Sequence, residues 1–256
     1  MTDENQEENE IEILPDNISK KPHYIFKVIV IGSSGVGKTS LTIRALKNEF
    51  NLLVNPTIGF EFLTMKLKYC DKIIALQIWD TCGQEIYQSV ISRFYKRASM
   101  ALLVYSIADK KTFLDLNKWL EEIKNNCDSD IKIALVGNKI DLQDSRDVTK
   151  EEALEFKEKN NLDLIFESSA KHGDNSKDIF FETAKLLYKN YNLIERNNSI
   201  RSKKSVKKER EPSFSLKKNS IKKKSLKKNN ISNYDDEDDL YMESDKNNNH
   251  GSMCCK

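Results

Sequence analysis

The chain has 256 residues, a length that favours one or two domains. Its 42 basic and 40 acidic residues give a formal net charge of +2, and 38% of its residues are hydrophobic, fewer than in a wholly globular chain. The sequence contains no run of about 18 apolar residues, so no membrane-spanning helix is predicted. The acidic first residues lack the apolar core of a secretory signal. Five cysteines are too few and too scattered for a disulfide framework, which favours a reducing cytosol.

Composition divides the chain into three parts. Residues 1–23 are acidic and polar and are predicted to form a disordered leader. Residues 24–192 are dense in apolar and periodic segments and are predicted to form one domain. Residues 193–256 are predicted to form a disordered tail, with a Lys-rich segment, an acidic block at Asp235–Asp239 and a cysteine pair near the end. The small net charge is therefore a sum of opposed segments.

The predicted domain alternates strand-like and helix-like segments. In chain order, strands are predicted at 24–31, 60–69, 72–79, 100–107, 131–136 and 162–166, and helices at 39–48, 85–97, 112–126, 150–159 and 178–191. Unalternated apolar strands separated by helices predict a mostly parallel sheet that is covered on both faces. Ligands of such a sheet lie beyond the carboxyl ends of its strands.

A glycine-rich segment directly follows the first strand. It fits the phosphate-loop pattern of Gly, four residues, then Gly-Lys-Ser/Thr, and consists of Gly32, Ser33, Ser34, Gly35, Val36, Gly37, Lys38 and Thr39. The glycines allow backbone N–H groups to surround phosphate oxygens, and the following helix offers its positive end. Lys38 supplies a charge near the outer phosphates, and the Thr39 hydroxyl is suited to bind Mg²⁺. The alternative is a Gly/Ser turn that merely ends in Lys-Thr.

A second motif favours guanine nucleotides over adenine nucleotides as the ligand. Asn138, Lys139 and Asp141 follow the predicted strand 131–136. Guanine presents an N1–H and an exocyclic amine on one edge, and the Asp141 carboxylate can accept from both, whereas adenine lacks this donor pair. Asn138 can hold neighbouring loops, and the stem of Lys139 can cover the base.

The segment Trp79–Glu85 supplies groups for the terminal phosphate. Asp80, at the end of a strand, is suited to hold Mg²⁺ through water, Gly83 offers a backbone N–H, and Gln84 can orient an attacking water. The alternative for Gln84 alone is an ordinary polar surface residue.

These motifs together resemble those of the Ras superfamily of small GTPases, and more closely those of the Rab family. The resemblance covers about two thirds of the chain and adds a first switch at residues 55–59 and a Ser169-Ala170-Lys171 motif. It implies a three-layer P-loop NTPase fold, with a six-stranded, mostly parallel sheet, one antiparallel strand and about five helices. It also implies that Thr57 reaches Mg²⁺, that Phe50 packs against guanine and that Ala170 donates a backbone N–H to the base. The nucleotide-binding residues implied in addition to those named above are Ser40, Ser169 and Lys171.

Several sequence features resemble the Rab family in particular, and some depart from it. Phe62, Trp79 and Tyr95 resemble the aromatic triad that displays the switch surface to effectors, although ordinary core packing also explains them. Cys82 stands where the family has alanine, residues 86–89 differ from the usual second switch, and Phe60 is larger than usual.

The tail resembles Rab tails in its two cysteines. Cys254 and Cys255 precede the last residue of the chain. This end is not the four-residue prenylation signal, but it resembles the ends of Rab proteins that receive two geranylgeranyl groups. Two lipids anchor a protein stably, whereas one chain binds a membrane only marginally. The lysines of the tail can add attraction to an anionic membrane. A soluble spacer or a nuclear or RNA-binding segment remains the alternative for these lysines.

The expected function is a GTP/GDP switch of vesicle traffic that hydrolyses GTP slowly and acts on the cytoplasmic face of an intracellular membrane. The family implies a guanine exchange factor, a GTPase-activating protein, effectors, a prenylation escort and a GDP-dissociation inhibitor as partners. A monomer without a nucleic-acid partner is expected. Two alternatives stay open at this stage, namely a GTP-bound scaffold with negligible catalysis and a Ras-like signalling GTPase of the plasma membrane.

Overall fold

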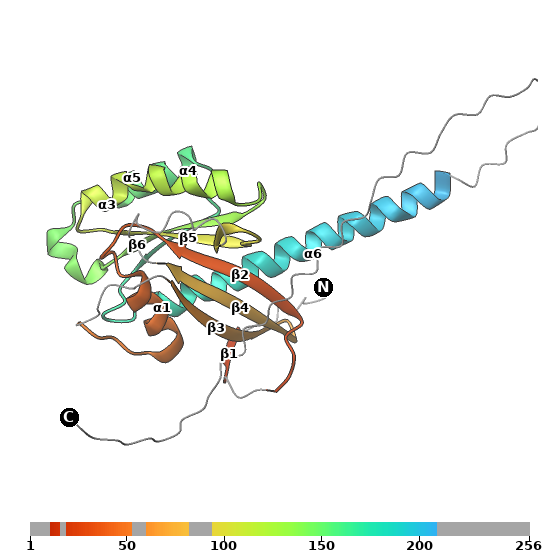
Figure 1. The fold of residues 1–256 in the computed structure, drawn as a ribbon, viewed down its shortest axis with the longest axis horizontal. Helices are drawn as coiled ribbons and strands as arrows, with labels where there is room; N and C mark the ends of the chain where they lie inside the picture. Colours follow the sequence, from red (N-terminus) through yellow and green to blue (C-terminus); the bar gives the residue numbers. More distant parts are fainter. Residues whose placement is uncertain (1–10, 16–18, 53–59, 82–93, 209–256) are drawn as a thin grey trace, which may run out of the picture. The chain divides into compact units, whose positions relative to one another are not determined.

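A seven-stranded sheet forms the centre of the fold (Figure 1). The computed structural model describes residues 11–15, 19–52, 60–81 and 94–208, all within one unit of residues 1–209. The strands, in chain order, are β1 (Glu12–Leu14), β2 (Tyr24–Ile31), β3 (Phe60–Tyr69), β4 (Lys72–Thr81), β5 (Met100–Ser106), β6 (Lys132–Asn138) and β7 (Leu164–Ser168). Their spatial order is β1-β3-β4-β2-β5-β6-β7. The β1–β3 and β3–β4 pairs are antiparallel, and the other pairs are parallel.

Helices cover both faces of the sheet and give the described part of the chain three layers (Figure 1). One face packs against α1 (Lys38–Lys47) and α6 (Ser176–Lys208). The other packs against α3 (Lys110–Leu114), α4 (Leu116–Asn126) and α5 (Lys150–Lys159). A short 3₁₀ helix, η2 (Ile140–Ser145), follows β6. Every residue of β5 is buried, as expected for a central parallel strand with an unalternated apolar sequence.

All six predicted strands are present, and no end differs from its prediction by more than two residues. The predicted sheet lacked β1, which lies within the predicted leader and pairs Glu12 to Leu14 with Lys68 to Lys66 of β3. Ile13 of this strand packs, partly buried, against the apolar core. A three-residue strand held by backbone pairing leaves no periodic pattern in the sequence, so sequence analysis did not predict it.

The helices differ from prediction mainly at their ends. The segment predicted as one helix over 112–126 is divided into α3 and α4 at Asp115, and Asp109 caps the start of α3. The predicted last helix continues to Lys208, into the predicted tail, because the residues after Tyr191 include neither Gly nor Pro before that point. The helix predicted over 85–97 lies largely outside the described residues. Within the described part of the chain, no helix has the length and apolar character required to cross a bilayer.

Candidate nucleotide-binding site

Four segments that carry predicted site residues end at one edge of the sheet in the described part of the chain. The glycine-rich loop follows β2, Asp80 is the last residue but one of β4, Asn138 ends β6, and Ser169 follows β7. These four strands run in the same direction, so their carboxyl ends face one edge. This is where an open parallel sheet binds its ligand.

The glycine-rich loop is held close to neighbouring backbone. Gly37 caps the start of α1 with a φ of 93°, in the left-handed region that favours glycine. A Cβ at this position would lie 2.5 Å from Nδ2 of Asn138. The loop therefore approaches Asn138 closely, and α1 begins directly after it, with the positive end of its dipole at the loop.

Lys38 is the buried cation of this loop. Its side chain is 6% exposed, and its Nζ donates to the carbonyl oxygens of Gly32 at 2.8 Å and Ser33 at 3.0 Å. The loop thus folds around the ammonium group. This arrangement places a positive charge where the outer phosphates of a nucleotide would need one.

Thr39 and Asp80 meet beside Lys38. The Thr39 hydroxyl donates to Oδ2 of Asp80, which is fully buried at the end of β4. Oδ1 of Asp80 has no hydrogen-bond partner among the described residues. A buried, unsatisfied carboxylate oxygen next to a threonine hydroxyl fits the oxygen ligands that Mg²⁺ prefers.

Burial also changes the protonation of Asp80. Desolvation raises the pKa of Asp80 to about 6, although the hydrogen bond from Thr39 and the charge of Lys38 lower it. A divalent cation at the free oxygen would favour the ionised form further. The donor set and its electrostatics therefore fit a hard cation held between the loop and β4.

Asn138 joins three of the loops. It is 1% exposed, and its Nδ2 donates to the carbonyl of Val36 at 2.9 Å. Its Oδ1 accepts from Oγ of Ser168 and from the backbone N–H of Ala170, both at 3.3 Å. The N–H of Ala170, expected to donate to the base, is thus directed to Asn138 through a long bond.

Asp141 is held by the loop that follows β7. The Ser169 hydroxyl donates to Oδ1 of Asp141 at 2.7 Å, and Ser169 Oγ accepts from the backbone N–H of His172 at 3.1 Å. One carboxylate oxygen of Asp141 is therefore engaged by Ser169. The geometry fixes the carboxylate next to the Ser169-Ala170-Lys171 segment.

Comparison with known proteins identifies the family. A model of the Ras family matches residues 27–189. The chain is 44% identical over 166 residues to the Ras-related protein RABA1b of Arabidopsis thaliana, covering 65% of this chain and 76% of the relative. It is 42% identical over 180 residues to the Ras-related protein Rab11D of Nicotiana tabacum, covering 70% of this chain and 79% of the relative. The chain belongs to the Rab GTPases of the Ras family. It is therefore an enzyme that binds GTP and GDP and hydrolyses GTP.

In this Rab protein, the aromatic side chains that pack around Trp79 differ from the predicted triad in one residue. Phe62 is 46% exposed, and its ring lies 5.1 Å from that of Trp79, centroid to centroid. Phe94 lies 5.6 Å from Trp79 and 4.5 Å from Phe60. Tyr95 is also buried, but its hydroxyl donates to Glu122 of α4 at 3.0 Å. Phe94 thus occupies the place beside Trp79 that we expected for Tyr95.

Sequence analysis missed an arginine that supports the base loop of the Rab site. Arg44 of α1 donates from Nε to the carbonyl of Ala170 at 2.8 Å and from Nη2 to that of Lys171. Phe50, expected to pack against guanine, is half-buried against the core on the same side of the sheet. No sequence motif marks Arg44, because its partners are backbone carbonyls far along the chain.

A second missed contact fixes the phosphate loop of the Rab site from the other face of the sheet. The Ser33 hydroxyl donates to Oδ2 of Asp115 at 2.9 Å and accepts from Nε1 of Trp119 at 3.5 Å. Asp115 is the residue that divides α3 from α4. From this position its carboxylate reaches the loop that follows β2.

Some predicted site residues of the Rab protein lie outside the described part of the chain. They are Thr57, Gly83, Gln84, Cys254 and Cys255, together with Cys82 and the second-switch residues 86–89. Their roles stay predictions.

Proposed function

We propose that this Rab GTPase is a molecular switch that recruits effectors to intracellular membranes in its GTP-bound state and regulates vesicle traffic. The observation that carries the proposal is that hydrogen bonds of Asn138 join the phosphate loop to the loop after β7, beside the Thr39–Asp80 pair. Residues that we expect to bind phosphate, metal and base therefore lie at one edge of the sheet, which supports the proposal. The Rab names of the relatives support the assignment to membrane traffic.

The nucleotide is held by the residues gathered at this edge. Phosphates bind residues 32–40, where Lys38 opposes the charge of the outer phosphates. Thr39 and Thr57 would hold Mg²⁺, with Asp80 contributing through water, and this ion would neutralise charge on the phosphate oxygens. The base lies among Phe50, Asn138, Lys139, Asp141, Ser169, Ala170 and Lys171.

The switch depends on the terminal phosphate. Thr57 and Gly83 order the two switch segments when GTP is bound, and hydrolysis releases them. The exposed ring of Phe62, with Phe60 and Trp79, forms an apolar surface next to these segments in the sequence and suits effector binding. An exchange factor and a GTPase-activating protein set the ratio of the two states.

Two geranylgeranyl groups on Cys254 and Cys255 anchor the protein to the cytoplasmic face of an endomembrane. The lysines of the tail add electrostatic attraction to anionic lipid. A prenylation escort presents the protein for lipidation, and a GDP-dissociation inhibitor returns the monomer to the cytosol. Mass measurement of the C-terminal peptide tests this arrangement, since a peptide with one or no prenyl group would contradict it.

Gln84→Leu tests the catalytic role of Gln84. We expect single-turnover GTP hydrolysis to slow by roughly an order of magnitude or more, because leucine cannot hydrogen-bond the attacking water. GTP binding by the same variant, measured by fluorescent-nucleotide titration, should stay intact and serves as the internal control. Hydrolysis at the wild-type rate would refute the role.

The cellular readout uses the same variant. A tagged Gln84→Leu protein should accumulate on one class of intracellular membrane, because the GTP-bound state persists. A Cys254/Cys255 double variant is the matched control and should remain in the cytosol. Equal membrane binding by both proteins would contradict the lipid anchor.

A further inference from the structure

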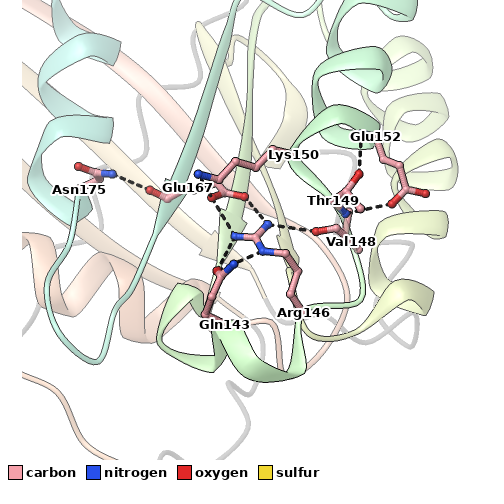
Figure 2. Close-up of polar contacts among 8 residues, drawn as sticks. All are labelled: Gln143, Arg146, Val148, Thr149, Lys150, Glu152, Glu167 and Asn175. Atoms are coloured by element: carbon pink, nitrogen blue, oxygen red, sulfur yellow. Dashed lines mark hydrogen bonds and ion pairs between the residues drawn. The ribbon is translucent and has the colours of Figure 1, made fainter.

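Arg146 makes a dense set of contacts just beyond the predicted guanine-recognition segment. It directly follows η2, which contains Asp141. Its guanidinium donates twice to Oε1 of Gln143, at 3.1 and 2.9 Å, and once to the carbonyl of Val148 at 3.1 Å. It also donates to both carboxylate oxygens of Glu167, at 2.6 and 3.0 Å. Figure 2 shows the guanidinium between Gln143 and Glu167.

The Arg146–Glu167 pair differs from an ordinary surface ion pair. The two side chains are only 13% and 20% exposed, and the contact is bidentate. Partly buried, bidentate arginine–carboxylate pairs are geometrically more specific and less screened by solvent than exposed pairs. The hydrogen bond to Glu167 raises the pKa of Arg146, which agrees with a strong contact.

Glu167 is itself fixed on both sides. It lies in β7 opposite Gly137 of β6, one residue before Ser168. Its backbone carbonyl accepts from Nδ2 of Asn175 at 2.8 Å (Figure 2). Glu167 therefore gives Arg146 a rigid anchor at the start of the loop that carries Ser169 and Ala170.

The segment that contains Asp141 is mostly exposed, and its first residue, Ile140, is partly buried against the core. It is a 3₁₀ helix without a buried residue, and Leu142 within it has non-helical angles. Hydrogen bonds of 3₁₀ helices have poor geometry, so such a segment holds its shape weakly. Two of the side-chain contacts described above connect this segment to β7 and the loop after it. One is the bond from Ser169 to Asp141, and the other is the bond from Arg146, which directly follows the segment, to Glu167.

We propose that Arg146 and Glu167 form a clamp that sets the distance between Asp141 and Ala170, and that this clamp determines guanine affinity and selectivity. The proposal rests on the nucleotide site proposed above. Arg146 and Glu167 are positioning residues, since the groups they hold contact the base. Asp141 reads the exocyclic amine of guanine only when the loop after β7 lies at the correct distance.

The experiment compares Arg146→Gln, Glu167→Gln and the double variant in the full chain. The probes are fluorescent GDP and the matching inosine diphosphate, which lacks the exocyclic amine. Each single variant should release GDP on the order of tenfold faster, because a small displacement of Asp141 or Ala170 strongly weakens its contact with the base. The double variant should be no faster than the singles, and the ratio of inosine diphosphate to GDP dissociation rates should fall towards one. Arg146→Lys, which keeps the charge but not the bidentate contact, should release GDP faster than wild type.

The matched control is the ion pair between Lys132, at the start of β6, and Asp163, directly before β7, at the other end of these strands. Nζ of Lys132 lies 3.0 Å from Oδ1 of Asp163, and the side chains are 28% and 23% exposed. Lys132→Gln should leave the rate ratio unchanged even where it lowers thermal stability. Unchanged GDP release in both Arg146 variants, or an equal change in Lys132→Gln, would overturn the clamp. A wild-type protein that releases both nucleotides equally fast would instead refute the proposed base site.

Discussion

Replacing Asp141 with asparagine is expected to lower GTP affinity on the order of 10³-fold, and to make xanthosine triphosphate the better ligand. The Ser169 hydroxyl donates to Oδ1 of Asp141, so asparagine would keep its oxygen there and turn its amide towards the base. This amide would face the exocyclic amine of guanine, donor against donor. Xanthine carries a carbonyl at that position and would accept from the amide.

Competition between the two nucleotides measures this change. Asp144→Asn is the matched control, because Asp144 lies in the same 3₁₀ helix with an exposed side chain. The control should retain the guanine preference of the wild type. An unchanged ratio of GTP to xanthosine triphosphate affinity in Asp141→Asn would show that Asp141 does not read the base.

Gly32→Ala is expected to destabilise the fold by about 3 kcal/mol or more. A Cβ at Gly32 would lie 2.1 Å from the carbonyl oxygen of Val104, far inside van der Waals contact. Val104 is paired with Val136 of β6, and Leu103 beside it with Ile31 of β2. Neither the loop nor the central strand can yield without loss of these pairings.

Gly35→Ala provides the control in the same loop. Gly35 also has a positive φ, of 77°, but nothing lies within 4 Å of a Cβ built there. Its alanine variant should therefore show only backbone strain, roughly 1–2 kcal/mol. Thermal unfolding of both variants at one fixed GDP concentration checks the difference, since bound nucleotide stabilises the folded state. Equal melting temperatures would contradict the argument from Val104.

The sequence predicted the parts of the fold that are encoded locally. The six strands of the predicted sheet have continuous apolar runs or follow tight turns, and the phosphate-loop and Asn138–Asp141 motifs are contiguous. Contacts between distant segments were not predictable in this way. Arg44 and Arg146 reach partners 126 and 21 residues away, and no periodic pattern marks such a pairing.

Two differences concern local alternatives that the sequence pattern left open. Phe94 and Tyr95 are adjacent aromatic residues, and the structure places Phe94 beside Trp79 while the Tyr95 hydroxyl donates to Glu122. The turn at Asp115 coincides with a contact to Ser33, which lies 82 residues away. Neither contact leaves a signal in the local sequence pattern.

The short strand β1 has a consequence for how the protein behaves at high local concentration. β3 is ten residues long and would otherwise present its outer backbone groups as a template for another chain. The pairing of Glu12, Ile13 and Leu14 occupies part of that template, from Lys66 to Lys68. A short outermost strand that carries a charged residue is a poor docking edge for a second sheet. Copies at high local concentration would thus be protected against edge-to-edge aggregation by a segment of only three residues.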